Sequence, residues 1–379
     1  MNAPMAIASG GLPDPLALPH SQPVTLALQG GGSLGAFAWG VLDRLLDVPG
    51  LRIGVVSGAS AGAMNAALLA QGLATGGPSE AKRLLEVFWR RVAVSSGSLD
   101  LTAAASWLFP FSGIMAPMAD ALRQTTKGLS RQQINPLGLN PLRGVLDDLF
   151  DSTALGQEGA PSLVVSATRV SSGEARLFRD TEVTVEVLLA SACLPQLFPA
   201  VEIEGEFYWD GGFASNPPLR ALIEAGAPAD TLLVRTTPQE RPDLPTGDAA
   251  ILERTEEMTF GAALRQELRS LALAQRLLAD LPSATGVLAR LRDARLHVIG
   301  AEEAFRALKT GSHQDASWAF LQEMRELGHS AAERWLATDF AAVGLRSTLD
   351  LSGFAQPSLE LRLGTQPAVA SSDRKDCKA

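Results

Sequence analysis

Two glycine- and serine-containing stretches near the start of the chain have the residue types and spacing to carry chemistry. The first, GGGSLG at 30–35, fits both the G-x-G-x-x-G spacing of a dinucleotide loop and the G-x-S-x-G spacing of a hydrolase nucleophile. The second, GASAG at 58–62, fits only the nucleophile pattern. Three roles are open for the first stretch: it holds a nucleotide, carries the nucleophile at Ser33, or serves a nucleophile at Ser60.

The dinucleotide interpretation is the weakest of the three. An apolar strand at 24–29, a glycine loop and a helix form the correct context, but a Rossmann unit also needs an acidic residue near the end of its second strand. The second predicted strand, 53–57, is followed by Gly58 without a carboxylate. A glycine fingerprint that lacks this partner is poor evidence for a nucleotide.

The side chains beside the two serines favour Ser60 as the nucleophile. A nucleophile on a sharp strand-to-helix turn needs small neighbours, because the chain passes close to it. Ser60 lies between Ala59 and Ala61, whereas Ser33 is followed by Leu34 and then by aromatic residues. The alternative, that this motif is only a turn in a chain with 35 glycines, stays open until a base is found.

The glycine loop then gains a role beside Ser60. A tetrahedral intermediate needs hydrogen-bond donors at its oxyanion, and glycines leave their backbone N–H groups accessible. Gly30, Gly31 and Gly32 precede a predicted helix, whose positive dipole end points the same way. We expect these three N–H groups to form the oxyanion hole, although the loop also fits a simple strand-to-helix turn.

Asp210, in the stretch YWDGG, is the strongest candidate for the base. It follows an aromatic strand and precedes two glycines, which also suits a plain Asx turn. Because an ordinary Asp has a pKa of about 3.9, it can accept a serine proton only in a desolvated, pre-aligned contact. His297 keeps a Ser–Asp–His order open, but its place in a predicted strand indicates a structural histidine.

Strands and helices alternate along the first part of the chain, which predicts βαβ units and a parallel sheet. We expect a disordered leader at 1–23, a catalytic domain at 24–222, a mainly helical extension at 223–365 packed on that core, and a flexible tail at 366–379. Within the expected catalytic domain, segment 95–140 is rich in Gly, Pro and Ser but carries aromatic and Met residues at 107–118. It is interpreted either as an irregular excursion packed on the core or as a lid over a lipid-accepting cleft.

The bulk composition excludes some partners. The 379 residues carry a net charge of −9, so neither nucleic acid nor an anionic membrane is attracted by charge alone. Two cysteines offer no disulfide framework, and no apolar run of about 18 residues is present. We expect a cytoplasmic protein that contacts a membrane or lipid surface only transiently.

The motifs GGGSLG, GASAG and DGG, in this order, resemble the patatin-like phospholipase family. The stretches SATRVSSGEARLF, ASACLPQLFPAVEIEGEFYWDGG and NPP resemble its bacterial branch, and the similarity covers 26–222. The resemblance implies an α/β fold, namely a three-layer α/β/α sandwich with a mostly parallel sheet. It implies an activity that needs no metal or organic cofactor. It also implies a Ser60–Asp210 dyad and an oxyanion hole at the three loop glycines, with further motif glycines at Gly35, Gly58, Gly62, Gly211 and Gly212.

Two positions depart from the family pattern. Many members carry Arg or Lys where this chain has Leu34, which weakens the case for an anionic phospholipid, and DGG replaces the frequent DGA. We expect a serine hydrolase that cleaves acyl esters of lipids. A thioesterase, an intracellular polyester depolymerase and a non-catalytic lipid-binding protein with the same fold are the alternatives, and head group, chain length and oligomeric state stay open.

Overall fold

A computed structural model describes residues 23–98, 135, 140–157 and 159–355 of the chain. The expected tail, almost all of the expected leader and the apolar stretch 107–118 of the lid segment lie outside the described residues. The first four residues of the lid segment continue a helix that ends at Ser98. Its two interpretations therefore stay predictions.

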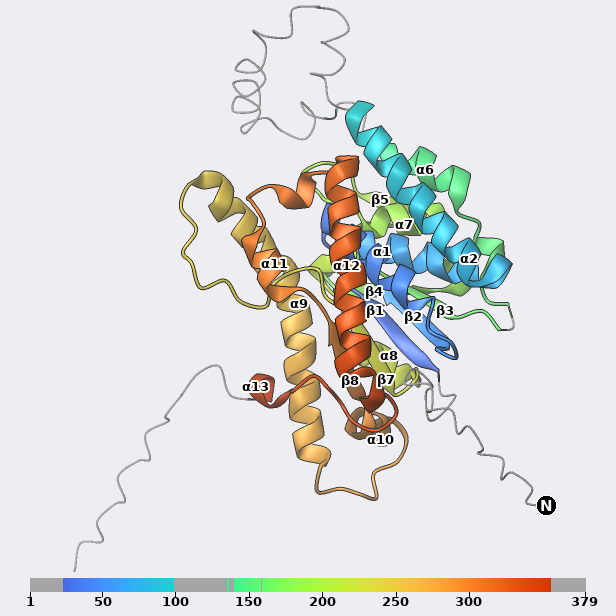
Figure 1. Ribbon diagram of the computed structural model, residues 1–379, viewed down its shortest axis with the longest axis vertical. Coiled ribbons are helices and arrows are strands. Elements are labelled where there is room, and N and C mark those ends of the chain that lie inside the picture. The colour runs from blue at the N-terminus through green and yellow to red at the C-terminus, as the bar shows by residue number, and fades with distance from the viewer. Residues whose placement is uncertain (1–22, 99–134, 136–139, 158, 356–379) are drawn as a thin grey trace, which may run out of the picture.

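A mixed eight-stranded sheet forms the centre of the protein (Figure 1), in the order β5-β6-β3-β2-β1-β7-β8, with β4 paired to β3. Neighbouring strands in the series β3-β2-β1-β7-β8 pair in parallel. Strands β4 and β6 pair antiparallel with β3, and β5 pairs antiparallel with β6. The strands are β1 Val24–Leu28, β2 Ile53–Gly58, β3 Ser162–Arg169, β4 Ala175–Arg179, β5 Val201–Ile203, β6 Glu206–Asp210, β7 Asp230–Val234 and β8 Arg295–Ile299.

Helices cover both faces of this sheet (Figure 1). They are α1 Gly35–Leu45, α2 Ala61–Ser98 with a kink at Gly77, α6 Pro141–Leu149, α7 Val185–Ser191, α8 Leu219–Ala225, α9 Asp248–Leu278, α10 Gly286–Asp293, α11 Glu302–Ala307, α12 Trp318–Thr338 and α13 Ser352–Ala355. Three short 3-10 turns also matter below: η1 Gly32–Leu34, η4 Gly211–Phe213 and η5 Ser312–Gln314.

Alternating side chains of the central strands divide the core into two layers, because successive residues of a strand point to opposite faces. Leu26 and Leu28 of β1 belong to the larger core, which α1, α2, α6, α7 and α12 cover. Ala27 belongs to the smaller core, under α8, α9 and α10. The predicted three-layer α/β/α sandwich is confirmed, and β7 and β8 place two of its strands beyond residue 222.

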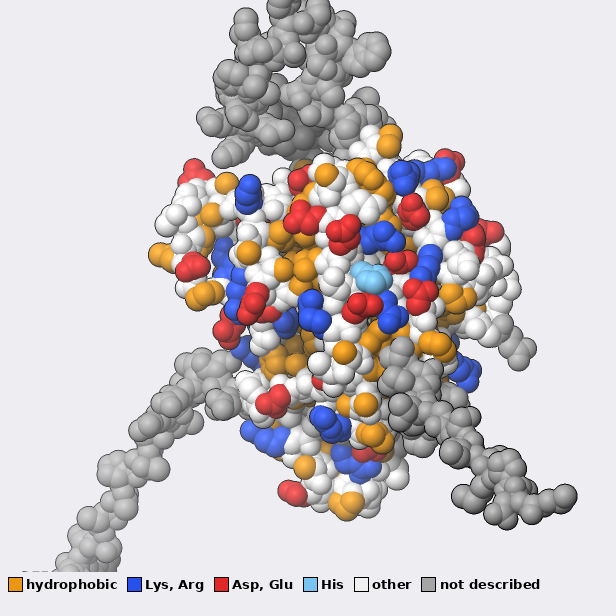
Figure 2. Space-filling view, viewed as in Figure 1, with side chains coloured by type: hydrophobic (Ala, Val, Ile, Leu, Met, Phe, Trp, Pro, Cys, Tyr) orange, Lys and Arg blue, Asp and Glu red, His pale blue; other side chains and the backbone are white. Residues whose placement is uncertain are grey.

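Helix α12 lies against α1 at two glycines. A β-carbon added at Gly328 would lie 2.0 Å from the carbonyl oxygen of Phe37, and one added at Gly40 would lie 1.8 Å from that of Arg325. The Arg325 guanidinium also donates to Asp43 at 2.8 Å. Basic and acidic side chains are interspersed over the face that α12 covers (Figure 2). The late helix α12 is thus fixed over α1, the helix that follows the glycine loop.

We predict that Gly328→Ala destabilises the fold by more than about 2 kcal/mol, because a backbone carbonyl cannot move away from the new methyl group without separating the helices. Gly144→Ala in α6 is the matched control, since nothing lies within 4 Å of the added carbon. That control should be neutral or stabilising by up to about 1 kcal/mol. Urea unfolding measures both, and equal effects would contradict the close-packing argument.

Candidate active site

The pairing of β3 explains how two distant motifs meet. Val165 of β3 pairs with Gly58 of β2 on one edge and with Phe178 of β4 on the other. Two residues further on, Ala167 pairs with Asp210 of β6 and, on the β4 edge, with Arg176. Strands β2 and β6 therefore share one edge of β3, end to end. Because they run in opposite directions, the end of β2 meets the end of β6.

Ser60 lies on the sharp turn between β2 and α2, with φ at 54° in the left-handed region that non-glycine residues rarely adopt. The turn is crowded by backbone: a β-carbon at Gly58 would lie 2.3 Å from Gly62, and one at Gly62 would lie 2.3 Å from the Leu28 carbonyl oxygen. The Ser60 N–H donates to Ser191 at the end of α7, with 3.0 Å to its Oγ. The turn thus has the small neighbours expected of a nucleophile's position.

The Asp210 side chain is buried, at 1% exposure, and lies close enough to the Ser60 side chain for the serine to lower its pKa. Its Oδ1 also accepts the Gly212 N–H at 2.8 Å. Burial raises the pKa of this carboxyl group to about 7, and the interactions with Gly212 and Ser60 offset only part of that rise. A carboxylate with this pKa has a much greater proton affinity near neutral pH than an exposed one.

The glycine loop packs directly on Ser60. A β-carbon at Gly30 would lie 2.7 Å from the Ser60 Cβ, so only glycine fits there. The Gly30 N–H donates to Asn216 Oδ1 at 2.8 Å. It is therefore not free to donate to an oxyanion, although the sequence analysis expected that role. The N–H groups of Gly31 and Gly32 have no hydrogen-bond acceptor among the described residues, and they precede α1.

The structure does not bring His297 to Ser60. His297 lies on β8, separated from β2 by β1 and β7. It is fully buried, with Nε2 at 3.1 Å from Asp230 Oδ1 and Nδ1 at 3.1 Å from Thr348 Oγ1. Bonds with His297 and Arg295 lower the Asp230 pKa despite its burial. This cluster ties the segment near Thr348 to the sheet edge and has the character of a structural ion pair.

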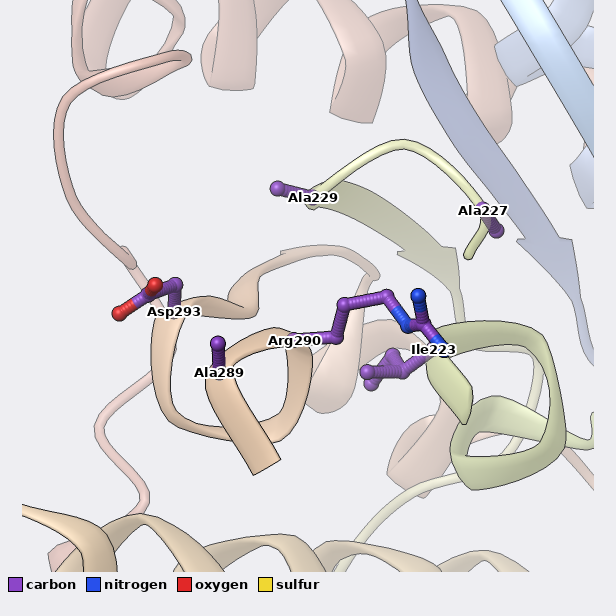
Figure 3. Close-up of a pocket in the computed structure, with 6 residues that line it drawn as sticks. All are labelled: Ile223, Ala227, Ala229, Ala289, Arg290 and Asp293. Carbon is purple, nitrogen blue, oxygen red and sulfur yellow. The ribbon is translucent and has the colours of Figure 1, made fainter. Parts of the chain in front are cut away.

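A pocket with a volume of about 180 Å³ lies between α8, α10 and the start of β7 (Figure 3). Ala229, Ile223 and Arg290 line it, beside the start of β7 and helices α8 and α10. Since β7 runs parallel to β1 and β2, its start faces the opposite end of the sheet from Ser60. Within the described ranges, no group of three His, Cys, Asp or Glu side chains could hold a metal ion.

The family model described as "Patatin-like phospholipase" matches residues 26–223. The chain belongs to the patatin-like phospholipase family. This confirms the resemblance seen in the motifs and places the chain among the lipid ester hydrolases. No curated protein sequence matches it.

Two bacterial structures are similar to this patatin-like chain. VipD from Legionella pneumophila is 15% identical, with a TM-score of 0.38, over 84% of this chain and 67% of that one. Full-length ExoU in complex with SpcU, from Pseudomonas aeruginosa, is 18% identical, with a TM-score of 0.28, over 83% of this chain. The match spans 53% of that second chain, about half its length.

Several supports of the patatin-like site were missed by the sequence analysis, and two lie beyond residue 223. Thr236 Oγ1 donates to the Gly30 carbonyl oxygen at 2.9 Å. Phe260 of α9 packs on Phe213 of η4, with ring centroids 4.7 Å apart. The role of Ser191 was also missed, and Asn216 entered the sequence analysis only through the NPP stretch of the family resemblance. Thr236 and Phe260 belong to no recognised motif, and the stretches that contain Ser191 and Asn216 do not indicate which distant groups these residues contact.

The raised pKa of Asp210 predicts that Asp210→Asn stabilises the protein at alkaline pH. Between about pH 3.8 and 7 the unfolded carboxyl group ionises while the folded one stays protonated, so stability falls as pH rises. The full penalty applies above about pH 7, and it is absent below the unfolded pKa. Asparagine keeps the acceptor for Gly212 and removes the penalty. We expect a gain of up to about 4 kcal/mol at pH 8.5.

Urea unfolding at pH 4 and pH 8.5 measures this gain as the difference between variant and wild type. Asp151→Asn is a control of opposite sign, because hydrogen bonds from the Thr153 hydroxyl and N–H lower the Asp151 pKa. It should not stabilise at pH 8.5. A gain for Asp210→Asn that is the same at both pH values would disprove the linkage.

Proposed function

We propose that this chain is a serine lipid acyl hydrolase in which Ser60 is the nucleophile and Asp210 the base. The observation that carries the proposal is the buried Asp210 carboxyl group at the end of β6, which meets the end of β2 beside Ser60, a residue on a left-handed turn. Strained backbone at a nucleophile and a carboxyl group with a raised pKa are features that cluster at catalytic sites.

In acylation, the Asp210 carboxylate takes the Ser60 hydroxyl proton while Oγ attacks the ester carbonyl carbon. The carbonyl π electrons move to oxygen and form a tetrahedral oxyanion. As the intermediate collapses, the bond to the alcohol oxygen breaks and protonated Asp210 returns the proton to that oxygen. The products are a free alcohol and an acyl ester on Ser60.

Deacylation repeats the sequence with water. Asp210 accepts a proton from the water molecule as it attacks the acyl carbon, and then returns the proton to Ser60 Oγ as the fatty acid leaves. Near neutral pH, a base whose pKa is about 7 is both substantially ionised and able to hold the proton.

We assign the oxyanion donors to Gly31 and Gly32 rather than to all three loop glycines. The Gly30 N–H serves Asn216 instead, while the next two N–H groups precede α1 and lie beside its positive end. This refines the expectation from the sequence and leaves Gly30 as the residue that packs on Ser60.

The substrate we propose is an acyl ester of a lipid without a required anionic head group. Leu34 replaces the cation found in many family members, and its side chain is buried in the larger core rather than offered to a head group. No helix in the described part of the chain is long and apolar enough to cross a membrane. Transient contact with a lipid surface and a cytoplasmic location stay predictions. A panel of neutral lipids, phospholipids, acyl thioesters and polyesters separates the alternatives.

Ser60→Ala should abolish ester turnover and labelling by a fluorophosphonate probe, because the probe reacts only with an activated serine. Ser33→Ala is the matched control, since Ser33 occupies the other G-x-S-x-G and is mostly buried in η1. It should keep most of its activity. An inactive but folded Ser33→Ala beside an active Ser60→Ala would reverse the assignment, and a wild type that neither labels nor turns over would favour a non-catalytic protein.

Asp210→Asn should lower kcat by about 10²–10⁴, the range for loss of a positioned base. In the wild type, kcat/KM should fall as pH drops below about 7, because the base becomes protonated. His297→Gln should keep kcat at temperatures where it is folded, since the ring is bonded to Asp230 rather than to the site. A folded, inactive His297→Gln beside an active Asp210→Asn would restore a histidine triad.

A further inference from the structure

Thr236 holds the carbonyl side of the glycine loop. It is fully buried just after β7, beyond the residues that the family model matches, and its Oγ1 donates to the Gly30 carbonyl oxygen at 2.9 Å. Its own N–H donates to Gln29 Oε1 at 3.0 Å, and the Gln29 N–H donates to the Val234 carbonyl oxygen at 3.0 Å. The hydroxyl group is therefore fixed relative to β1 and β7.

That hydrogen bond sets the orientation of one peptide group. The Gly30 carbonyl and the Gly31 N–H belong to the same planar, trans peptide unit, so they point in opposite directions. With the carbonyl oxygen held toward Thr236, the Gly31 N–H must point away from it. Asn216 holds the preceding peptide group through the Gly30 N–H, and Gly30 itself packs on Ser60.

The peptide group between two glycines needs such a restraint. Neither Gly30 nor Gly31 has a side chain that limits its backbone angles, so rotation of this unit is opposed by little except its hydrogen bonds. An oxyanion donor stabilises the transition state only when its direction is fixed before the reaction. A rotated unit would turn the Gly31 N–H away and present a carbonyl oxygen, which repels the developing charge.

We infer that Thr236 is a positioning residue, whose hydroxyl group aims the Gly31 N–H at the oxyanion formed on Ser60. The inference rests on the proposed hydrolase function. It extends the catalytic apparatus into the region that follows the family match, and it assigns Thr236 a role in the transition state rather than in substrate binding.

The test compares Thr236→Val, which removes the hydroxyl group at nearly constant shape, with Thr236→Ser, which keeps it. Thr25→Val is the matched control. Thr25 is also fully buried, and its Oγ1 donates to a backbone carbonyl, that of Pro228, at 3.2 Å, but it lies at the opposite end of β1 from the loop. Kinetics use a soluble short-chain ester, and melting curves establish that each variant is folded.

Thr236→Val should lower kcat by about 10- to 100-fold with little change in KM, because an oxyanion donor acts mainly in the transition state. Affinity for a trifluoromethyl ketone, whose adduct with serine carries an oxyanion, should fall by a similar factor. Thr236→Ser should restore most of kcat. Thr25→Val should lose comparable thermal stability and keep kcat.

An unchanged kcat in Thr236→Val, an equal loss in Thr25→Val, or failure of serine to rescue would each overturn the inference while leaving the proposed function intact. A loss confined to KM would also overturn it, since that result indicates a role in substrate binding. A folded wild type that neither turns over esters nor labels at Ser60 would refute the proposed function, and this inference with it.

Discussion

The buried carboxyl group of Asp210 is the constraint on which the site depends. Removing it from water raises its pKa to about 7, so its proton affinity near neutral pH is much greater than that of an exposed carboxylate. The same burial is a cost to folding whenever the group is ionised, and only the Gly212 N–H and Ser60 offset it. A raised proton affinity and the stability of the fold therefore oppose each other at one side chain, a conflict that is common at functional sites.

Sheet topology places that carboxyl group beside Ser60. Ser60 and Asp210 are far apart in the chain, and they meet because a parallel and an antiparallel strand occupy one edge of β3 end to end. Glycines then allow the backbones to approach: Gly58 and Gly62 beside the serine, and Gly211, where a β-carbon would lie 2.1 Å from the Ser166 carbonyl oxygen. These three glycines are needed because a side chain at any of them would clash with neighbouring backbone.

The sequence predicted what depends on local pattern. Alternating strands and helices indicated the α/β sandwich, small neighbours singled out Ser60, and a conspicuous DGG singled out Asp210. It did not predict which backbone groups would form hydrogen bonds with side chains that are distant in the sequence. Asn216 Oδ1 takes the Gly30 N–H that was expected to face the oxyanion, because a distant loop folds back onto the glycine turn. Thr236 and Ser191 were missed for the same reason: a single hydroxyl residue has no spacing that marks its long-range partner.

The structural unit around the glycine loop extends beyond residue 223, where the family match ends. Strand β7, beyond it, pairs with β1 and so holds one side of the strand from which the glycine loop emerges. In η5, the His313 carbonyl oxygen leaves only 2.6 Å for a β-carbon at Gly32, whose φ of 58° already favours glycine. The His313 ring lies against Glu256 and Glu253 of α9, which raise its pKa, and these contacts connect η5 to that helix. Elements beyond residue 223 therefore pack against the glycine loop, so the loop and these elements must fold together.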